Sequence, residues 1–159
     1  METVAIPTSG QPTKEMELGL VPIQVLENAW HQAAPLLQKA LARAADGLTL
    51  EDVYAHLCLG EMQLWATWEK GKVDCLAYMV TQFLKDHGQY TLLIRLFAGL
   101  NRELWLHFLP LVEDWALMEG ATKIEVWGRA GWERVLAPHN FKKKLVVLSK
   151  ELRPKRMDS

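Results

Sequence analysis

Side chains that could carry acid–base chemistry are scattered along this sequence. Glu61, Asp86 and His87 lie beside glycines that predict turns, and Glu125 lies in a short apolar stretch. Enzymes that move protons hold an acid and a base within hydrogen-bond reach of the reacting group, and these four residues form no recognisable pair. Because charged side chains mostly lie at the surface, the sequence favours solvated carboxylates and predicts no catalytic residue.

The histidines and cysteines show no metal-binding pattern. His31, His56 and His107 fall in helical stretches without a second ligand four residues further on, whereas metal sites need several ligands at suitable spacing. Cys58 and Cys75 have apolar neighbours and no paired spacing, so they are interpreted as reduced thiols in the core. No metal is therefore predicted.

Basic residues raise two further questions. Arg95 lies inside an apolar run, where a lone charge is costly; it is either a partner in a buried ion pair or a pocket group that faces an acidic ligand. Arg129 could contact a ligand phosphate or cap a helix. Lysines 142–144 and the run RPKR at 153–156 lack interleaved aromatic residues, and the formal net charge is −1, so no nucleic acid is expected as a partner.

Length and composition predict one globular domain. The chain has 159 residues, of which 50% are hydrophobic and 23% charged, and this suits a fold with a sizeable core. Residues 1–17 and 153–159 are polar and without periodicity, so they are predicted to be a flexible N-terminal arm and a basic tail around a domain at 18–152. Neither secretion nor a membrane span is expected, since no apolar run approaches the roughly 20 residues that a span needs.

Hydrophobic periodicity predicts an alternation of helices and strands. Residues 25–45 and 49–59 predict two helices, with Pro35 breaking or kinking the first and Thr49 capping the second. The later elements predicted are strands at 62–69, 73–83 and 90–100, a helix at 103–119, a strand at 123–128, a short helix at 130–138 and a strand at 143–152.

The last third of the chain resembles a known family. EDWALMEGATKIEVWGR, residues 113–129, and GWERVLAPHNFKKKLVVLSKEL, residues 131–152, are similar to the long helix, fifth strand, last helix and final strand of the GNAT family of acetyl-CoA-dependent N-acetyltransferases. The resemblance is sharpest over 111–152. It implies an α/β (α+β) fold: a mixed central sheet with helices on both faces and a V-shaped split between the fourth and fifth strands, here 90–100 and 123–128. Where the family has Gly-Phe, this chain has Asn140-Phe141, and asparagine also adopts the left-handed conformation that closes a helix.

The resemblance also places a cofactor site. The family carries Arg/Gln-x-x-Gly-x-Gly/Ala between the fourth strand and the long helix, where backbone amides bind pyrophosphate. The corresponding stretch FAGLNRELW keeps one glycine, adds the negative charge of Glu103 and has bulky leucines. No cofactor is therefore expected; the alternative is acetyl-CoA, held by Gly99, Leu100, Asn101 and Arg102.

The general acid of the family has no counterpart at its usual position. Members similar to this chain carry a tyrosine four residues before the Gly-Phe turn, and that position holds Leu136 here. Leucine cannot donate a proton, so the role is vacant unless Tyr78 or Tyr90 reaches the site.

Two functions follow as expectations. The segments LFAGL and WGRAGWERVL look like the GNAT-like proteins of tailed phages and prophages, which implies a non-catalytic virion-associated or assembly protein, present in several copies, in the virion or the host cytoplasm. Seven tryptophans favour an interaction protein, with Trp105 or Trp127 at the interface with other virion or assembly proteins. The alternative is an acetyl-CoA-dependent N-acetyltransferase that acts on an unknown amine or protein.

Overall fold

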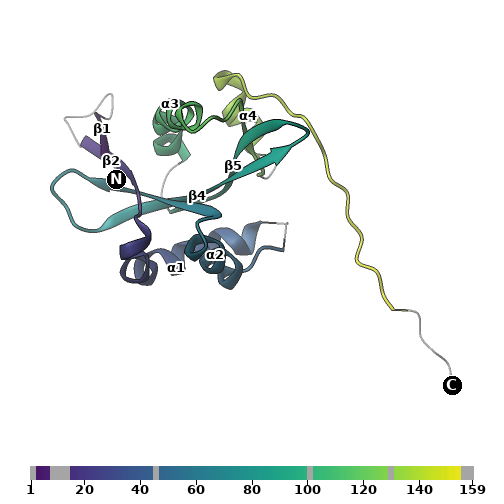
Figure 1. Ribbon diagram of the computed structural model, residues 1–159, viewed down its shortest axis with the longest axis horizontal. Coiled ribbons are helices and arrows are strands. Elements are labelled where there is room, and N and C mark those ends of the chain that lie inside the picture. Colours follow the sequence, from purple (N-terminus) through teal and green to yellow (C-terminus); the bar gives the residue numbers. More distant parts are fainter. Residues whose placement is uncertain (1–2, 8–14, 45–46, 100–101, 129–130, 155–159) are drawn as a thin grey trace. The chain divides into compact units, whose positions relative to one another are not determined.

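The computed structural model describes residues 3–7, 15–44, 47–99, 102–128 and 131–154 (Figure 1). The chain divides into two compact units, residues 1–129 and 130–159. The sequence predicts a single domain over residues 18–152, but the short C-terminal helix and the residues after it form a unit of their own.

Within the described residues, the first unit is built on a mixed sheet of six strands in the spatial order β1-β2-β3-β4-β5-β6. Strands β1 to β5 pair antiparallel with their neighbours, and β6 pairs parallel with β5. The strands are β1 Thr3–Pro7, β2 Glu15–Leu20, β3 Met62–Glu69, β4 Cys75–Asp86, β5 Gln89–Gly99 and β6 Lys123–Val126.

Helices cover both faces of this sheet (Figure 1). Helices α1, Leu26–Arg43, and α2, Leu50–Cys58, follow the short 3-10 turn η1, Ile23–Val25, and pack on one face. Helix α3, Arg102–Met118, lies on the other face. The predicted GNAT-like fold class is thereby confirmed. Among the described helices, none combines the length and the apolar character needed to cross a membrane.

Two separate sets of side chains fill the core. On the α3 face, the Trp65 ring meets the Trp115 ring edge-on with centroids 4.8 Å apart. On the opposite face the cluster comes from two helices and three strands. Its buried members are Leu26, Ala33, Leu37, Leu41, Val53, Leu57, Met62, Leu64, Ala66, Tyr78, Val80, Leu96 and Ala98.

Local signals explain how the helices begin and why they continue through prolines. Thr49 caps α2 as predicted: its hydroxyl accepts from the Asp52 amide at 3.1 Å, and the Asp52 carboxylate accepts from the Thr49 amide at 3.2 Å. Pro35 lies inside α1 without ending it, so of the two predicted outcomes the break is wrong and the kink stays a prediction. Both Pro35 and Pro110 of α3 are on the solvent side, where water can satisfy the carbonyl that a proline leaves without its amide partner.

The N-terminal residues contribute strands where the sequence predicts a flexible arm. β2 pairs with β3 over five residue pairs, and its Met16 and Leu18 side chains are buried. Thr67 donates a hydrogen bond to the Glu17 carbonyl at 2.8 Å, and the Trp68 indole donates to the Glu17 carboxylate at 2.7 Å. Residues 3–7 and 15–17 of the predicted arm lie in β1 and β2, because pairing between neighbouring strands supplies contacts that the local sequence does not show.

The second unit contains helix α4, Gly131–Leu136, and the 3-10 turn η2, Ala137–His139. Asn140 ends this turn in the left-handed conformation, with φ of 69°, which confirms the role predicted for it. Residues 141–154 form neither helix nor strand. The strand predicted at 143–152 is therefore wrong for the isolated chain, since a strand requires a neighbour to accept and donate its backbone hydrogen bonds.

Candidate functional site

The V-shaped split expected by resemblance lies between β5 and β6. Parallel pairing joins the two strands from Thr91–Lys123 to Ile94–Val126, and the Trp127 amide then donates to the Ile94 carbonyl at 3.3 Å. Beyond this point β5 runs on to Gly99 as a partner of β4. β5 therefore continues without β6 along its second half, from Arg95 to Gly99.

A β-bulge at Arg95 marks the start of the split. Val80 pairs with Leu96 and Thr81 pairs with Ile94, so Arg95 is an extra residue in β5. A bulge bends the strand and increases its local twist. It turns β5 at the position where pairing with β6 stops.

The Arg95 side chain joins three strands at this bulge. Its Nη1 donates to Gln82 Oε1 of β4 at 2.9 Å, and its guanidinium carbon lies 5.4 Å from the centroid of the Trp127 ring, after β6. The sequence left open whether Arg95 forms an ion pair or faces a ligand. These contacts place it in the wall of the split and leave both interpretations standing.

Gly99 ends β5 in a conformation that favours glycine, with φ of 105°. A Cβ atom at this position would lie 2.7 Å from the Leu76 carbonyl oxygen and 2.8 Å from both Cα and Cβ of Ala77. Atoms do not approach that closely without movement, so any other residue would force the backbone of β5 or β4 to shift. Gly99 thus brings β5 against β4 just before the chain enters α3.

The rest of the predicted cofactor loop is only partly described. Leu100 and Asn101 lie outside the described residues, and Arg102 is the first residue of α3. Glu103 is in the first turn of α3 and is exposed. An anion at the start of a 17-residue helix would meet backbone amides and a favourable dipole, which Glu103 opposes in part.

Acetyl-CoA fits the backbone of this region. A long thioester arm needs two strands that are not paired with each other, and β5 continues for five residues after its pairing with β6 ends. Its phosphates need amides at a helix start, and α3 begins three residues after Gly99. Arg129, which could contact a phosphate, lies outside the described residues.

Neither tyrosine named from the sequence offers an accessible hydroxyl in the open part of the split. Tyr78 pairs with Ala98, so it is level with that part, but its side chain is 1% exposed within the core on the α1 and α2 face. Burial is the main cause that raises the pKa of Tyr78, and its hydroxyl is hydrogen-bonded to the Cys75 thiol. Tyr90 stacks on Phe83 at the opposite end of β5, with centroids 4.8 Å apart.

The carboxylates named from the sequence pair with neighbouring basic groups. Glu61 Oε2 lies 2.5 Å from His56 Nδ1, and Asp86 Oδ1 lies 3.3 Å from His87 Nε2, both at the surface. Glu125 lies 3.9 Å from Lys123. The three pairs are separate from one another in the structure. We therefore assign no catalytic role to these carboxylates.

The two cysteines are free thiols; the predicted core location is wrong for Cys58, whereas Cys75 packs against the core cluster. Cys58 is exposed at the end of α2, and Cys75 is half-buried at the start of β4. Burial raises the pKa of Cys75, so its thiol is a poor nucleophile. Within the described part of the chain, no group of three His, Cys, Asp or Glu side chains is placed to hold a metal ion.

The two tryptophans proposed as interface residues have different environments. Trp105 is 2% exposed and packs near Phe97 and Phe108, with centroids 5.8 and 6.3 Å away. It is a core residue in this chain, because the first turns of α3 press its ring onto β5, and its place at an interface stays a prediction. Trp127 is 52% exposed, and its predicted contact with a partner stays a prediction.

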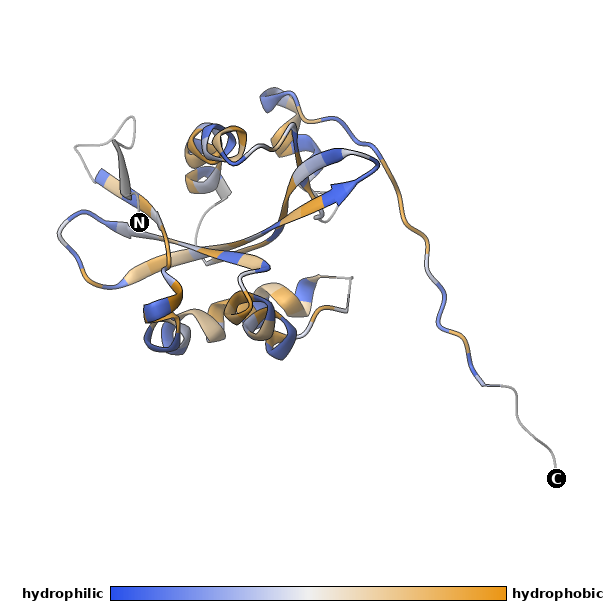
Figure 2. Ribbon diagram, in the orientation of Figure 1, coloured by the Kyte–Doolittle hydropathy of each residue, from blue (hydrophilic) through white to orange (hydrophobic). Residues whose placement is uncertain are grey.

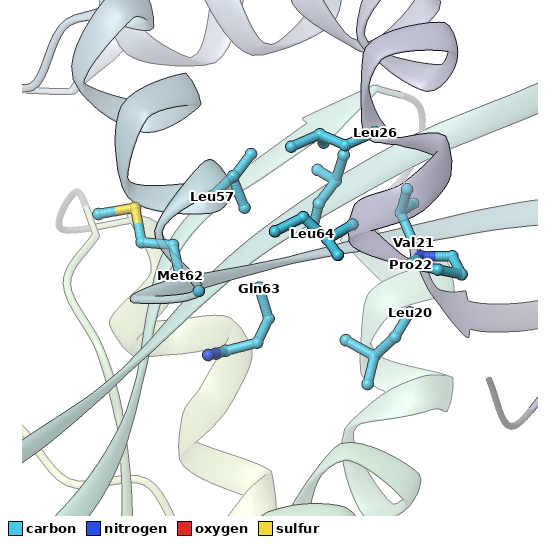
Figure 3. A pocket seen from close by; sticks show the side chains of 10 residues that line it. Leu20, Val21, Pro22, Leu26, Leu57, Met62, Gln63 and Leu64 are labelled. Carbon is cyan, nitrogen blue, oxygen red and sulfur yellow. The ribbon is translucent and has the colours of Figure 1, made fainter.

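An apolar pocket of about 370 Å³ lies on the other side of the sheet from α3, between η1, the end of α2 and the start of β3 (Figure 3). Gln63 is the one polar side chain among the ten residues that line it. Its Oε1 already accepts a hydrogen bond from Thr81 at 2.8 Å. With no charged group in its wall, this pocket suits neither phosphates nor a polar amine.

Sequence reasoning missed the bulge and the contacts that hold it. The signal available was a polar pair, Gln82 in β4 and Arg95 in β5, inside otherwise apolar strands. Recognising them as partners requires the register between β4 and β5, which depends on the bulge itself. Gly99 was identified, but from the phosphate loop and not from its close approach to β4.

Comparisons with known proteins bear on the fold. No protein-family model matches the sequence, and no curated protein sequence matches it either. Solved structures do match in shape. An aminoglycoside acetyltransferase from an uncultured soil metagenomic sample, in complex with sisomicin, has a TM-score of 0.63 at 9% identity, over 87% of this chain and 97% of its own.

Two further acetyltransferases agree. Aminoglycoside N-acetyltransferase AAC(6')-Iy in complex with CoA has a TM-score of 0.64 at 12% identity, over 87% of this chain and 95% of its own. Glucosamine-6-phosphate N-acetyltransferase from Arabidopsis thaliana has a TM-score of 0.57 at 10% identity, over 87% and 99%. This chain has the GNAT acetyltransferase fold. At such low identity the likeness concerns the fold alone, and this chain has its own loop and side chains at the split.

Proposed function

We propose that this chain binds acetyl-CoA in the split between β5 and β6 and transfers the acetyl group to an amine. The observation that carries the proposal is the course of β5. The strand stops pairing with β6 after Ile94, ends at Gly99, where a Cβ atom would collide with β4, and is followed by α3.

Each part of the split has a role in this proposal. The amides at the start of α3 hold the phosphates. Arg95 and Trp127 form the wall beside the thioester arm. Acetyl-CoA would supply the acetyl group: a carbon–nitrogen bond would form to the amine as the carbon–sulfur bond breaks, the amine nitrogen would release one proton to water, and the thiolate would leave. Since Leu136 occupies the position of the family's general acid, water supplies the proton that the thiolate takes up.

A second candidate is a non-catalytic binding protein, such as the virion-associated or assembly protein expected from the sequence. The observations that favour it are Leu136, a side chain that cannot protonate a leaving group, and Glu103, a negative charge at the expected phosphate site. In this case the split between β5 and β6 has no ligand, and the protein acts by binding other proteins through its surface.

Isothermal titration of the full chain with acetyl-CoA separates the two candidates. We expect a micromolar dissociation constant, which corresponds to about 8 kcal/mol of binding free energy. Arg102→Glu should weaken binding at least tenfold. Lys85→Glu is the matched control, because it makes the same charge change at the exposed far end of β4. No binding by wild-type protein at millimolar acetyl-CoA would favour the second candidate.

Thiol release from acetyl-CoA then tests catalysis. Sisomicin and glucosamine 6-phosphate are suitable first acceptors, since both carry amines and both are named with proteins of similar fold. Release that depends on the added amine supports transfer. If acetyl-CoA binds but no tested amine causes thiol release, the proposed cofactor site would stand and the proposed reaction with these acceptors would be wrong.

A further inference from the structure

The apolar pocket beside η1 has no part in the proposed acetyl transfer. Its lining comes from the end of β2, η1, α1, α2 and the start of β3, and β4 separates β3 from β5 in the sheet. Leu26, Leu57 and Leu64 close the pocket on one side and are buried, and Gln63 lies on the other side (Figure 3). Ile23 lines the pocket and is 54% exposed, so it lies at the mouth.

The walls of the pocket are held by contacts within the first unit. The Val21 amide donates to the Leu64 carbonyl at 2.8 Å, which ties the start of η1 to β3. The Glu61 amide donates to the His56 carbonyl at 2.9 Å, and the Glu61 carboxylate also pairs with the His56 ring. These two contacts fix the turn between α2 and β3. A preformed pocket spares a ligand the cost of ordering its walls.

A chain of hydrogen bonds sets the direction of the Gln63 amide. Trp65 Nε1 donates to Thr81 Oγ1 at 3.0 Å, and an indole N–H can only donate. The Thr81 hydroxyl therefore accepts from Trp65 and donates its own hydrogen to Gln63 Oε1 at 2.8 Å. Since the oxygen of Gln63 is used in this way, Nε2 with its two N–H groups is the polar atom that its side chain offers to a ligand.

The chemistry of the lining selects the class of ligand. Among the described residues that line the pocket none is charged, so a charged ligand would lose its hydration without a partner. Figure 2 shows hydrophobic residues on the sides of α1 and α2 that face the sheet. An ordered water needs about three hydrogen bonds, whereas the side chains here offer one polar group. Water in this pocket is therefore readily displaced by an apolar ligand.

The volume of the pocket sets the size of the ligand. A cavity of about 150 Å³ holds a benzene molecule, and this pocket has a volume of about 370 Å³. We propose that it binds an uncharged, mainly apolar small molecule of about ten to twelve carbon atoms, with one hydrogen-bond acceptor that meets Gln63 Nε2. The proposal does not rest on acetyl-CoA binding, because the split between β5 and β6 contributes no residue to the pocket.

A titration of the isotope-labelled full chain with 2-acetylnaphthalene, followed by amide correlation spectra, tests the proposal. This probe is uncharged and carries one ketone oxygen on an apolar ring system. We expect saturating shifts at the amides of residues 20–26 and 57–64, and unchanged amides at 94–99 in the split. 2-Naphthoate has the same rings with a carboxylate in place of the ketone, and its dissociation constant should be higher by about tenfold or more.

Two variants locate the probe within the pocket. Ile23→Trp fills the mouth and should raise the dissociation constant about tenfold. Val25→Trp is the matched control, because Val25 is 46% exposed in the same turn and is not among the lining residues. Gln63→Glu keeps an oxygen for Thr81 but replaces the two N–H donors with a charge, so it should weaken binding by a similar factor. Circular dichroism checks that the variants fold.

Three results would overturn the proposal. The first is the absence of saturating shifts up to the solubility limit of 2-acetylnaphthalene. The second is a set of shifts centred on residues 94–99, which would place the probe in the split. The third is an equal affinity of Ile23→Trp and Val25→Trp for the probe, or an equal affinity of the wild type for 2-naphthoate and 2-acetylnaphthalene.

Discussion

The two sides of β5 are built differently. On one side β4 pairs with it at ten positions, from Gln89–Asp86 to Gly99–Ala77, with the bulge at Arg95. On the other side β6 pairs at four positions and stops at Ile94. One strand thus serves as an interior element of the sheet along its first half and as the wall of an opening along its second half.

The bulge makes this division possible. An extra residue lets β5 bend away from β6 while its pairing with β4 continues to Gly99. The opening on the β6 side of β5 therefore depends on the bulge, which belongs to the pairing of β5 with β4. Substitutions in the closed half should therefore affect stability, and those in the open half should affect binding as well.

The largest effect is expected in the closed half. Ile94 is fully buried, and Ile94→Ala should lower the free energy of unfolding by about 3 kcal/mol through lost burial and a residual cavity. Urea unfolding measures the change. Val73→Ala, at an exposed position, should cost less than about 0.5 kcal/mol. Equal losses at the two positions would contradict the placement of Ile94 in the core.

Next in size is the effect at the end of the open half. Gly99→Ala forces a Cβ against the Leu76 carbonyl oxygen and Ala77, whereas Gly88→Ala meets nothing within 4 Å. Both glycines have positive φ, so both variants carry backbone strain of about 1 kcal/mol. Gly99→Ala should lose at least about 1 kcal/mol more and should also bind acetyl-CoA more weakly. If the two variants behave alike, the close approach of β5 to β4 is not what positions the start of α3.

Tyr78→Phe tests whether the paired side of β5 takes part in chemistry. The Tyr78 hydroxyl is buried and bonded to Cys75, so its removal should cost about 1 kcal/mol and leave the rate of acetyl transfer unchanged. A slower acetyl transfer with an unchanged free energy of unfolding would mean that the paired side of β5 does take part in the chemistry.

The same substitution has a signature in alkali. Burial raises the pKa of Tyr78 above its ordinary value near 10. The stability linked to its proton is therefore fully present below pH 10 and declines as the pH rises above that value, because the unfolded chain ionises first. Between about pH 9 and pH 11, the free energy of unfolding should therefore decline less for Tyr78→Phe than for the wild type.

The smallest effect is expected at the boundary between the two halves. Trp127 is half-exposed beneath the Arg95 guanidinium, and Trp127→Ala should cost about 0.5–1 kcal/mol, as expected for a cation–π contact near the surface. Trp127→Phe should recover part of the loss. A cost above about 2 kcal/mol in urea unfolding would mean that the ring belongs to the core.

Features set by neighbours in the chain could be predicted from the sequence. The Thr49 cap, the left-handed Asn140 and the positions of α1 and α3 depend on residues a few places apart. β2 could not be predicted, because its short alternation of Glu and apolar residues becomes a strand only through β3.

The site was predictable to a lesser extent for the same reason. Gly99 and the split follow from the family resemblance, while the bulge at Arg95 depends on registers with two strands that the sequence does not fix. The strand predicted at 143–152 has apolar, β-branched residues that suit a sheet, but a pattern of side chains does not state which chain supplies the neighbouring strand.

The outward-facing prolines of the two long helices also restrict which packings the chain can choose. Turning α1 about its own axis until Pro35 met the sheet would bring the His31 carbonyl into the interior without its amide partner, at about 1–3 kcal/mol. The same holds for Leu106 if α3 were turned to bury Pro110. Each proline therefore destabilises packings in which its helix is rotated about its own axis, and it does not destabilise the native packing.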